Sequence, residues 1–251
     1  HEAPYLGTYY YLLNTAKPPL SNKLVRQALN LAIDRDRLVR LVIKGGQHPA
    51  QAFTPPGTGG FTPIPRLPAD SSQVNKAREL LAKAGFPGGK GFPRLEILYN
   101  TETNHKNIAE AIQAMWKENL GIEVGMYNQE WKVYLDSRRT MNYQIARAGW
   151  IADYNDPDNF LNLWVTNGGN NQTGFSNKGY DSLILASAKE RNPKKRHAIF
   201  QKLEDILLDE LPIIPIYIYT RPYLKEPAVQ GWYDNVEDTH VLKFISVSAK
   251  P

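Results

Sequence analysis

Cysteine is absent from the 251 residues of this sequence. Without thiols, the chain has no thiolate nucleophile, no Cys-ligated metal and no disulfide. The same absence fits an oxidising compartment, where a stray thiol is a liability. The function must therefore rest on other side chains, or on binding alone.

Long hydrophobic runs are also lacking. A membrane-spanning helix needs about 18 consecutive apolar residues, whereas the run 211–219 is interrupted by Pro212 and Pro215. The sequence starts at His1 and shows no signal-peptide pattern. We therefore expect a processed or truncated product from which an export signal has been lost.

The motifs of metal, nucleotide and nucleophile sites are missing as well. The histidines are scattered without zinc-site spacing, and no glycine cluster matches a phosphate-binding loop. The stretch 153–158 matches a calcium loop only in part, because Pro157 stands at its fifth position and no glycine at its sixth. We expect neither a metal nor another cofactor. The enzymatic hypothesis that remains is a metal-assisted site built from His105 and Asp153.

The formal net charge is +5. A basic balance can indicate nucleic-acid binding. Here Lys and Arg are mixed with Glu and Asp along expected helices, as in 76–83 and 189–209, which is typical of solvated helix faces. We therefore expect no nucleic-acid partner.

Hydrophobic periodicity predicts an α/β fold with a largely parallel sheet, because strands and helices alternate along the chain. The expected strands are 9–13, 95–99, 122–127, 143–148 and 241–247, with a proline-broken strand at 211–217 placed at an edge or irregular crossing. The expected helices are 21–32, 34–43, 70–84, 104–119, 130–139, 180–189 and 193–210. Residues 44–69 and 167–173 are expected to be loops.

Useful side chains gather where the strand 143–148 ends. Arg147 offers a fork for a carboxylate, Trp150 an apolar wall, and Asp153 a carboxylate for an ammonium, while Gly149 lets another backbone approach. Ligands of open α/β sheets bind beyond the carboxyl ends of strands. The residues therefore fit an extended zwitterionic ligand such as a peptide. They fit equally well a core tryptophan, a surface ion pair and a turn, and local chemistry leaves both interpretations open.

A wider set of motifs points in one direction. They are Gln129-Glu130-Trp131, Leu135-Asp136-x-Arg138, the run Ala146 to Asn155, Leu98-Tyr99-Asn100-Thr101 with His105, Val25 to Leu29 with Asp34-Arg35-Asp36, Trp116 to Gly121, and Pro212 to Tyr217. Together they resemble the periplasmic oligopeptide-binding proteins of ABC importers, over nearly the whole chain.

The resemblance implies a periplasmic-binding-protein fold of the second type, represented by its C-terminal lobe alone, with a mostly parallel sheet flanked by helices. Residues 1–14 would be a hinge strand from a missing first lobe, 15–235 the peptide-binding lobe, and 236–251 the returning hinge strand. The implied location is periplasmic or extracytoplasmic. The implied partners are an oligopeptide, the membrane permease subunits of the importer and the missing N-terminal lobe.

The resemblance also assigns roles to single residues. Asp153 would pair with the peptide α-ammonium, and Gly149 and Ile151 would hydrogen-bond the peptide main chain. Trp131 and Trp150 would wall side-chain pockets, and Arg138, Arg147 and His105 would meet the carboxylate end at different ligand lengths.

Two positions depart from the family pattern: Leu12 stands where its peptide-binding members often have Glu, and Glu237 where Tyr is common. Asp153 together with Arg147 favours a peptide ligand and a binding role without catalysis. The alternatives are a free-standing protein-interaction module, or a family member for another solute such as a dipeptide or a murein peptide.

Overall fold

A single mixed sheet organises the chain in the computed structural model, which describes residues 1–248. Its six strands lie in the order β2-β6-β1-β5-β3-β4. The strands are β1 (Glu2–Leu13), β2 (His48–Pro49), β3 (Leu95–Asn100), β4 (Val124–Gln129), β5 (Ile145–Ile151) and β6 (Ile213–Pro222). The α/β class is confirmed.

The expectation of a mostly parallel sheet is wrong. β3 pairs in parallel with β4 and β5, but β1 pairs antiparallel with both β5 and β6, and β2 antiparallel with β6. Strands β3 to β6 thus run in one direction, and β1 is threaded between β5 and β6 in the other. Alternating strands and helices predict only the parallel part, because the antiparallel pairing of β1 with β5 and β6 joins segments that are far apart in the sequence.

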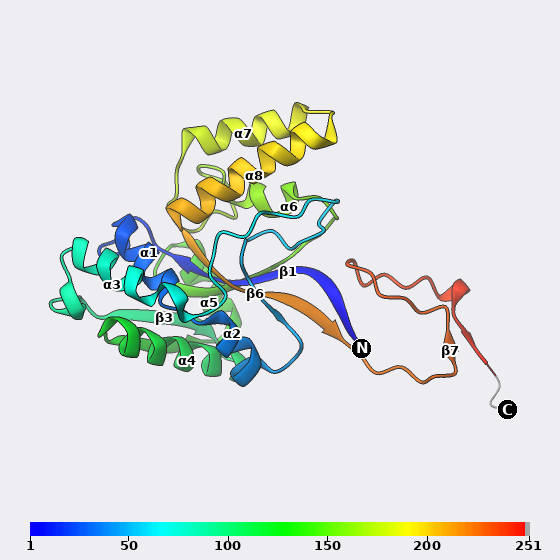
Figure 1. The fold of residues 1–251 in the computed structure, drawn as a ribbon, viewed down its shortest axis with the longest axis horizontal. Helices are drawn as coiled ribbons and strands as arrows, with labels where there is room; N and C mark the ends of the chain where they lie inside the picture. The colour runs from blue at the N-terminus through cyan, green and yellow to red at the C-terminus, as the bar shows by residue number, and fades with distance from the viewer. Residues whose placement is uncertain (249–251) are drawn as a thin grey trace.

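Helices cover both faces of the sheet (Figure 1). One apolar cluster unites β1, β3 and β6 with α1 (Lys23–Leu31), α2 (Arg35–Leu38), α3 (Val74–Lys83) and α4 (Thr103–Leu120). The second cluster lies on the other face, under α5 (Trp131–Arg139), α6 (Asp158–Leu161), α7 (Lys178–Lys189) and α8 (Pro193–Glu210). Side chains alternate between the faces of a strand, so each residue of β5 belongs to one layer or the other.

Helix ends follow local chemistry. The Glu102 carboxylate caps α4 by accepting from the amides of Asn104 and His105, and Gly121 ends that helix at a φ of 69°. The helix expected at 34–43 is capped by Asp34 but continues from α2 into a π-helical turn, Val39–Ile43. The loops at 44–69 and 167–173 are confirmed, apart from the two residues of β2.

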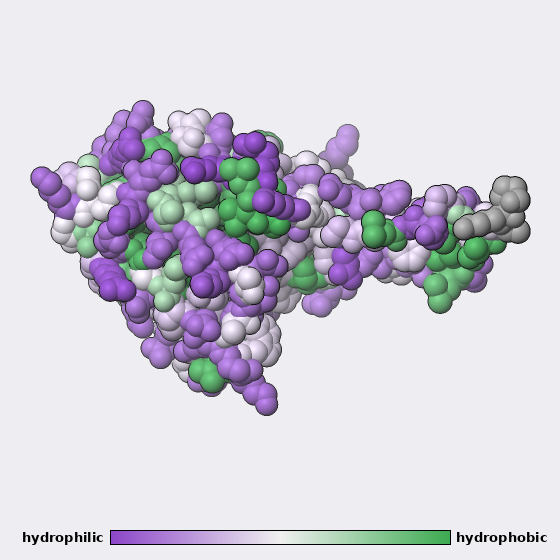
Figure 2. Space-filling view, turned by 90° about the horizontal axis from the view of Figure 1, so that it is seen from below, coloured by the Kyte–Doolittle hydropathy of each residue, from purple (hydrophilic) through white to green (hydrophobic). Residues whose placement is uncertain are grey.

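The C-terminal segment differs from expectation. The strand expected at 241–247 is wrong, because a 3₁₀ turn, Leu242–Phe244, precedes only a two-residue strand, β8 (Ser246–Val247). β8 pairs with β7 (Val229–Gln230) in a separate sheet. Residues 223–248 form an arm that projects from the end of the main sheet (Figures 1 and 2). Because the arm lies outside the core, the apolar alternation of residues 241–247 does not correspond to a buried strand face.

The proposed division at 1–14, 15–235 and 236–251 stays a prediction. The structure places β1 in the centre of the sheet and the amide of Leu6 3.1 Å from the carbonyl of Val236, so the two supposed hinge segments meet. Residues 249–251 of the last segment lie outside the described residues.

A buried carboxylate anchors the start of the 51–65 loop. Glu204 on α8 is fully buried and accepts hydrogen bonds from the amides of Phe53 and Thr54, at 3.1 and 2.7 Å. Burial raises the pKa of Glu204 above its usual 4.5. A carboxyl with a raised folded-state pKa contributes stability that is present below the unfolded-state pKa and is lost as pH rises through the folded-state value.

We therefore expect the Glu204→Gln variant to lose part of the pH dependence of stability. As pH rises above 4.5, the free energy of unfolding of the parent chain should fall relative to that of the variant. Urea unfolding at several pH values measures the difference, with the exposed Glu96→Gln as control. A parent-to-variant difference that is constant with pH would contradict the role given to Glu204.

Candidate functional site

The outer edge of β5 is open over most of its length. Along one side, Gly7 to Leu13 of β1 pair with all of β5. Along the other side, β3 reaches only Ile145 and Ala146. Within the part of the chain that the structure describes, no strand pairs with that side of residues 147–151.

The peptide groups on this open edge can be identified. The amide of Ala152 donates to Leu6 of β1 at 2.9 Å, so even-numbered residues of this stretch turn their peptide groups toward β1. The hydroxyl of Tyr134 donates to the carbonyl of Arg147, which therefore points away from β1. By alternation, the N–H and C=O groups of Gly149 and Ile151 also point to the open edge.

Arg147 turns its side chain toward the layer of α1 to α4. Its guanidinium carbon lies 4.9 Å from the centroid of the Tyr9 ring. The two Nη atoms lie 3.3 Å from Asn100 Oδ1 and 3.4 Å from the hydroxyl of Tyr219. Nε is buried and has no hydrogen-bond partner within the described residues. These partners are neutral, so the guanidinium keeps its capacity for an anion.

His105 lies in the same cavity as Arg147. Its Nδ1 is 3.4 Å from the hydroxyl of Tyr9 and 3.2 Å from the carboxylate of Glu102. Burial, reinforced by the charge of Arg147, lowers the pKa of His105 to about 4. The imidazole is therefore neutral at physiological pH, and Arg147 carries the positive charge of the pair.

This cavity has a volume of about 490 Å³ and contains residues that sequence reasoning missed. They are Glu102, Asn107, Tyr217 and Tyr219, beside Val42, Ile43, Gly45, Gln47, Asn104 and Ile108. The tyrosines carried one usable signal, because Tyr217 and Tyr219 alternate along β6 and so share a face with Tyr9, whose ring stacks on Tyr217 at 4.7 Å.

Gly149 follows Arg147 on the same face of β5, and the space in front of it is filled. A Cβ placed there would come within 2.8 Å of the Tyr219 hydroxyl. On this face of β5, the Tyr219 side chain therefore occupies the space that was predicted to admit another backbone. Any larger residue would displace Tyr219, which also contacts Arg147.

Trp150 lies on the opposite face of the sheet from Arg147, so the expected convergence of these two side chains is wrong. Alternation along β5 directs Trp150 into the layer of α5 to α8, where it packs on the second apolar cluster and donates Nε1–H to Asn159 at 2.7 Å. The alternative of Arg147 as a surface ion pair is also wrong, because no carboxylate contacts it in residues 1–248.

Trp131 and Arg138 form a second group, on α5. Both contact Tyr134: the ring of Trp131 stacks on it at 5.6 Å, and Arg138 Nη1 lies 3.3 Å from its hydroxyl. Arg138 Nε also donates to Gln172 at 3.0 Å. Since Tyr134 reaches the carbonyl of Arg147, this group abuts the open edge of β5.

Asp153 and Ile151 form a third group, in a cavity of about 330 Å³ between β1, the end of β5 and the arm. Asp153 is exposed. Asp153 and His105 line separate cavities, which removes the premise of the metal-assisted hypothesis. Within residues 1–248, His, Asp and Glu side chains form no group of three or more that could hold a metal ion.

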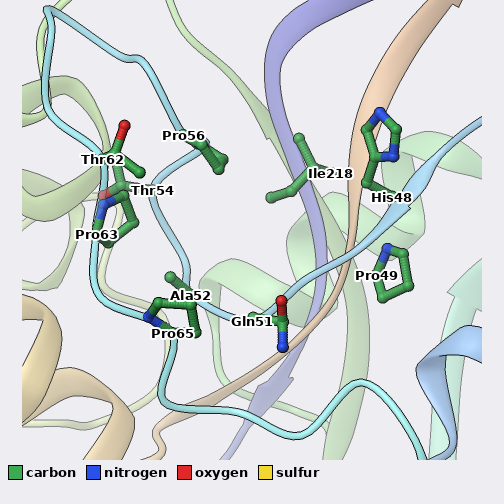
Figure 3. A pocket seen from close by; sticks show the side chains of 10 residues that line it. All are labelled: His48, Pro49, Gln51, Ala52, Thr54, Pro56, Thr62, Pro63, Pro65 and Ile218. Atoms are coloured by element: carbon green, nitrogen blue, oxygen red, sulfur yellow. The ribbon is translucent and has the colours of Figure 1, made fainter.

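A further, apolar cavity lies away from all eight predicted residues. It is enclosed by β2, Ile218 of β6 and the proline-containing loop that follows, with Pro56, Pro63 and Pro65 around it (Figure 3). Its volume is about 270 Å³. Of the predicted residues, Trp150 packs into the layer of α5 to α8, and the others divide among three places beside β5. Their roles in binding stay predictions.

The chain belongs to the bacterial extracellular solute-binding proteins, family 5, whose middle-region profile matches residues 1–172. It is 43% identical over 239 residues to the periplasmic murein peptide-binding protein MppA of Escherichia coli, covering 94% of this chain and 44% of that protein. It is 39% identical to the periplasmic oligopeptide-binding protein OppA of the same organism, covering 92% and 43%. The chain therefore spans about half the length of the curated relatives it matches.

Solved structures agree. The unliganded open form of the murein tripeptide-binding protein MppA superposes with a TM-score of 0.91 at 40% identity, over 98% of this chain and 48% of that one. The Haemophilus influenzae OppA complex with the peptide RPPGFSPFR gives 0.84 at 36% identity, over 99% and 50%. The resemblance inferred from sequence is confirmed. Among residues 1–248, no helix has the length and apolarity to cross a membrane.

Proposed function

We propose that this chain is the C-terminal lobe of a periplasmic peptide receptor that serves an ABC importer and binds oligopeptides without catalysing a reaction. The observation that carries the proposal is the open edge of β5, with the outward peptide groups of Gly149 and Ile151 between Arg147 and Asp153. A peptide in extended form can add to such an edge through main-chain hydrogen bonds, which do not depend on its side chains.

The charges at the two ends of this edge suit a zwitterion. Arg147 holds a guanidinium that contacts no carboxylate within residues 1–248 at one end, and Asp153 lies six residues further along the chain. Six residues of extended chain span at most about 20 Å, so a peptide of up to about six residues would match the distance. Main-chain recognition between fixed charges supports broad sequence tolerance with a defined polarity.

Partners and location follow from the same proposal. The relatives are named as periplasmic peptide-binding proteins, and a receptor of this kind would pass its ligand to membrane permease subunits. The second wall of the site would come from an N-terminal lobe. The proposed ligand class is oligopeptides, with murein peptides as the specific alternative because MppA is among the relatives.

The Asp153→Asn variant tests the proposal. In the whole receptor of which this chain would be a lobe, we expect trialanine to bind at least about tenfold more weakly to the variant, since one ion pair of about 1.4 kcal/mol is lost. Isothermal titration calorimetry measures the change, and the exposed Asp234→Asn serves as control. Equal affinity of parent and variant would exclude Asp153 as the ammonium anchor, and no binding of trialanine to the parent would reject the peptide receptor.

A further inference from the structure

The cavity that contains Asp153 holds a second acidic side chain. Glu237 lines it from the arm, opposite the end of β5. Both carboxylates are exposed, and neither side chain makes a hydrogen bond or ion pair within residues 1–248. Two unneutralised carboxylates thus face one space of about 330 Å³.

A shared backbone contact fixes both segments. Leu6 of β1 accepts a hydrogen bond from the amide of Ala152 at 2.9 Å and donates its own amide to the carbonyl of Val236 at 3.1 Å. The residues that follow these two contacts in the chain are Asp153 and Glu237. Backbone hydrogen bonds to the same strand residue, Leu6, therefore hold the segments of Asp153 and Glu237 at one cavity.

The neighbouring charges do not cancel Glu237. Asp238 binds Arg221, whose Nε lies 2.6 Å from Oδ2, and it also contacts His240 at 3.2 Å. The guanidinium of Arg221 lies over the ring of Tyr5, at 5.1 Å. The available cation is thus engaged by the acidic residue next in sequence, and Glu237 is left facing the cavity.

We propose that Glu237 is a specificity residue that favours peptides whose first residue carries a second positive charge, such as lysine or arginine. The inference rests on the proposed function, in which Asp153 takes the α-ammonium. A cationic side chain on the same residue would reach Glu237, while its methylene stem would lie along the apolar lining of Ile151 and Val236. Like-charged carboxylates in one cavity favour a doubly charged ligand end over a singly charged one.

The test compares two peptides that differ in one charge. Lysyl-alanyl-alanine and norleucyl-alanyl-alanine have first side chains of similar length, and only the lysine is cationic. Calorimetry on the whole receptor should show that the parent prefers the lysyl peptide by about fivefold, corresponding to about 1 kcal/mol. Glu237→Gln should abolish this preference and leave the norleucyl affinity unchanged.

A matched variant and the other outcomes separate the two proposals. Glu226→Gln removes an exposed carboxylate from the same arm, outside the cavity, and should keep the preference. If both peptides bind and the preference is absent from the parent, or survives in Glu237→Gln, the inference is overturned while the peptide receptor stands. If neither peptide binds the parent, both proposals fall together.

Discussion

Replacing Arg35 by Met is expected to destabilise the chain by about 3–5 kcal/mol, because it leaves several buried acceptors without a donor, at a cost of about 1–3 kcal/mol each. Arg35 is fully buried. Its Nε donates to the carbonyl of Pro215 at 2.8 Å, and its Nη atoms reach Asn30, Ile33 and Pro68. Methionine would fill the space but leave these acceptors without donors.

The contact matters because of where Pro215 lies. A proline has no N–H for a strand ladder, and the pairing of β1 with β6 shifts register between Tyr9 and Tyr10, opposite this segment. Arg35 supplies a donor to the Pro215 carbonyl at that irregular point. Burial lowers the pKa of Arg35 to about 9, which still leaves the guanidinium charged at neutral pH.

Chemical denaturation of parent and variant measures the loss, with Arg37→Met as the matched control. Arg37 lies on the same helix, but it is exposed, and its ion pair with Glu118 is long, at 3.9 Å. Its replacement should change the free energy of unfolding by no more than about 0.5 kcal/mol. Similar losses in both variants would show that helix α2, and not the fork of hydrogen bonds, is what Arg35→Met disturbs.

Sequence patterns predicted the helices well. The helix expected at 104–119 is α4, Thr103–Leu120, because it has a carboxylate cap, a periodic apolar face and a terminal glycine. The strand expected at 9–13 is longer, beginning at Glu2, because residues 2–4 and Thr8 pair with β6, and Gly7 and Thr8 with β5, before the aromatic run that carries the hydrophobic signal. The local hydrophobic pattern does not predict the part of a strand that is formed by pairing with distant strands.

The candidate site was predictable in residue types and not in arrangement. Arg147 and Trp150 are three apart, so alternation along a strand already places them on opposite faces. The partnership of Arg147 with His105 needs the pairing of β5 with β1, which brings Tyr9 between them. Glu237 could not be placed at all from local pattern, because long-range contacts bring the arm to the sheet, among them the hydrogen bond between Leu6 and Val236 and the ion pair between Arg221 and Asp238.

Replacing Arg147 by Gln is expected to weaken binding of a free-acid peptide by about 100-fold in the whole receptor, and binding of the same peptide with a C-terminal amide only a few-fold. Truncating one partner of a buried ion pair costs about 2–5 kcal/mol, and each 1.4 kcal/mol is about tenfold in affinity. Within residues 1–248, the partners of Arg147 are neutral and its buried Nε has no hydrogen-bond partner. The carboxylate of a bound peptide would therefore supply the counter-charge that these residues do not.

The acid-to-amide comparison distinguishes recognition of the carboxylate from support of the cavity wall. A structural role for Arg147, which packs on the Tyr9 ring and contacts Tyr219, would weaken both peptides equally. Arg139→Gln is the control, because its guanidinium is exposed and paired with Asp136. Since no carboxylate among residues 1–248 contacts the buried guanidinium of Arg147, Arg147→Gln should also leave the stability of the protein without peptide nearly unchanged. A large loss of stability would show that Arg147 supports the fold, whereas a loss of affinity confined to free-acid peptides would show that it binds the ligand carboxylate.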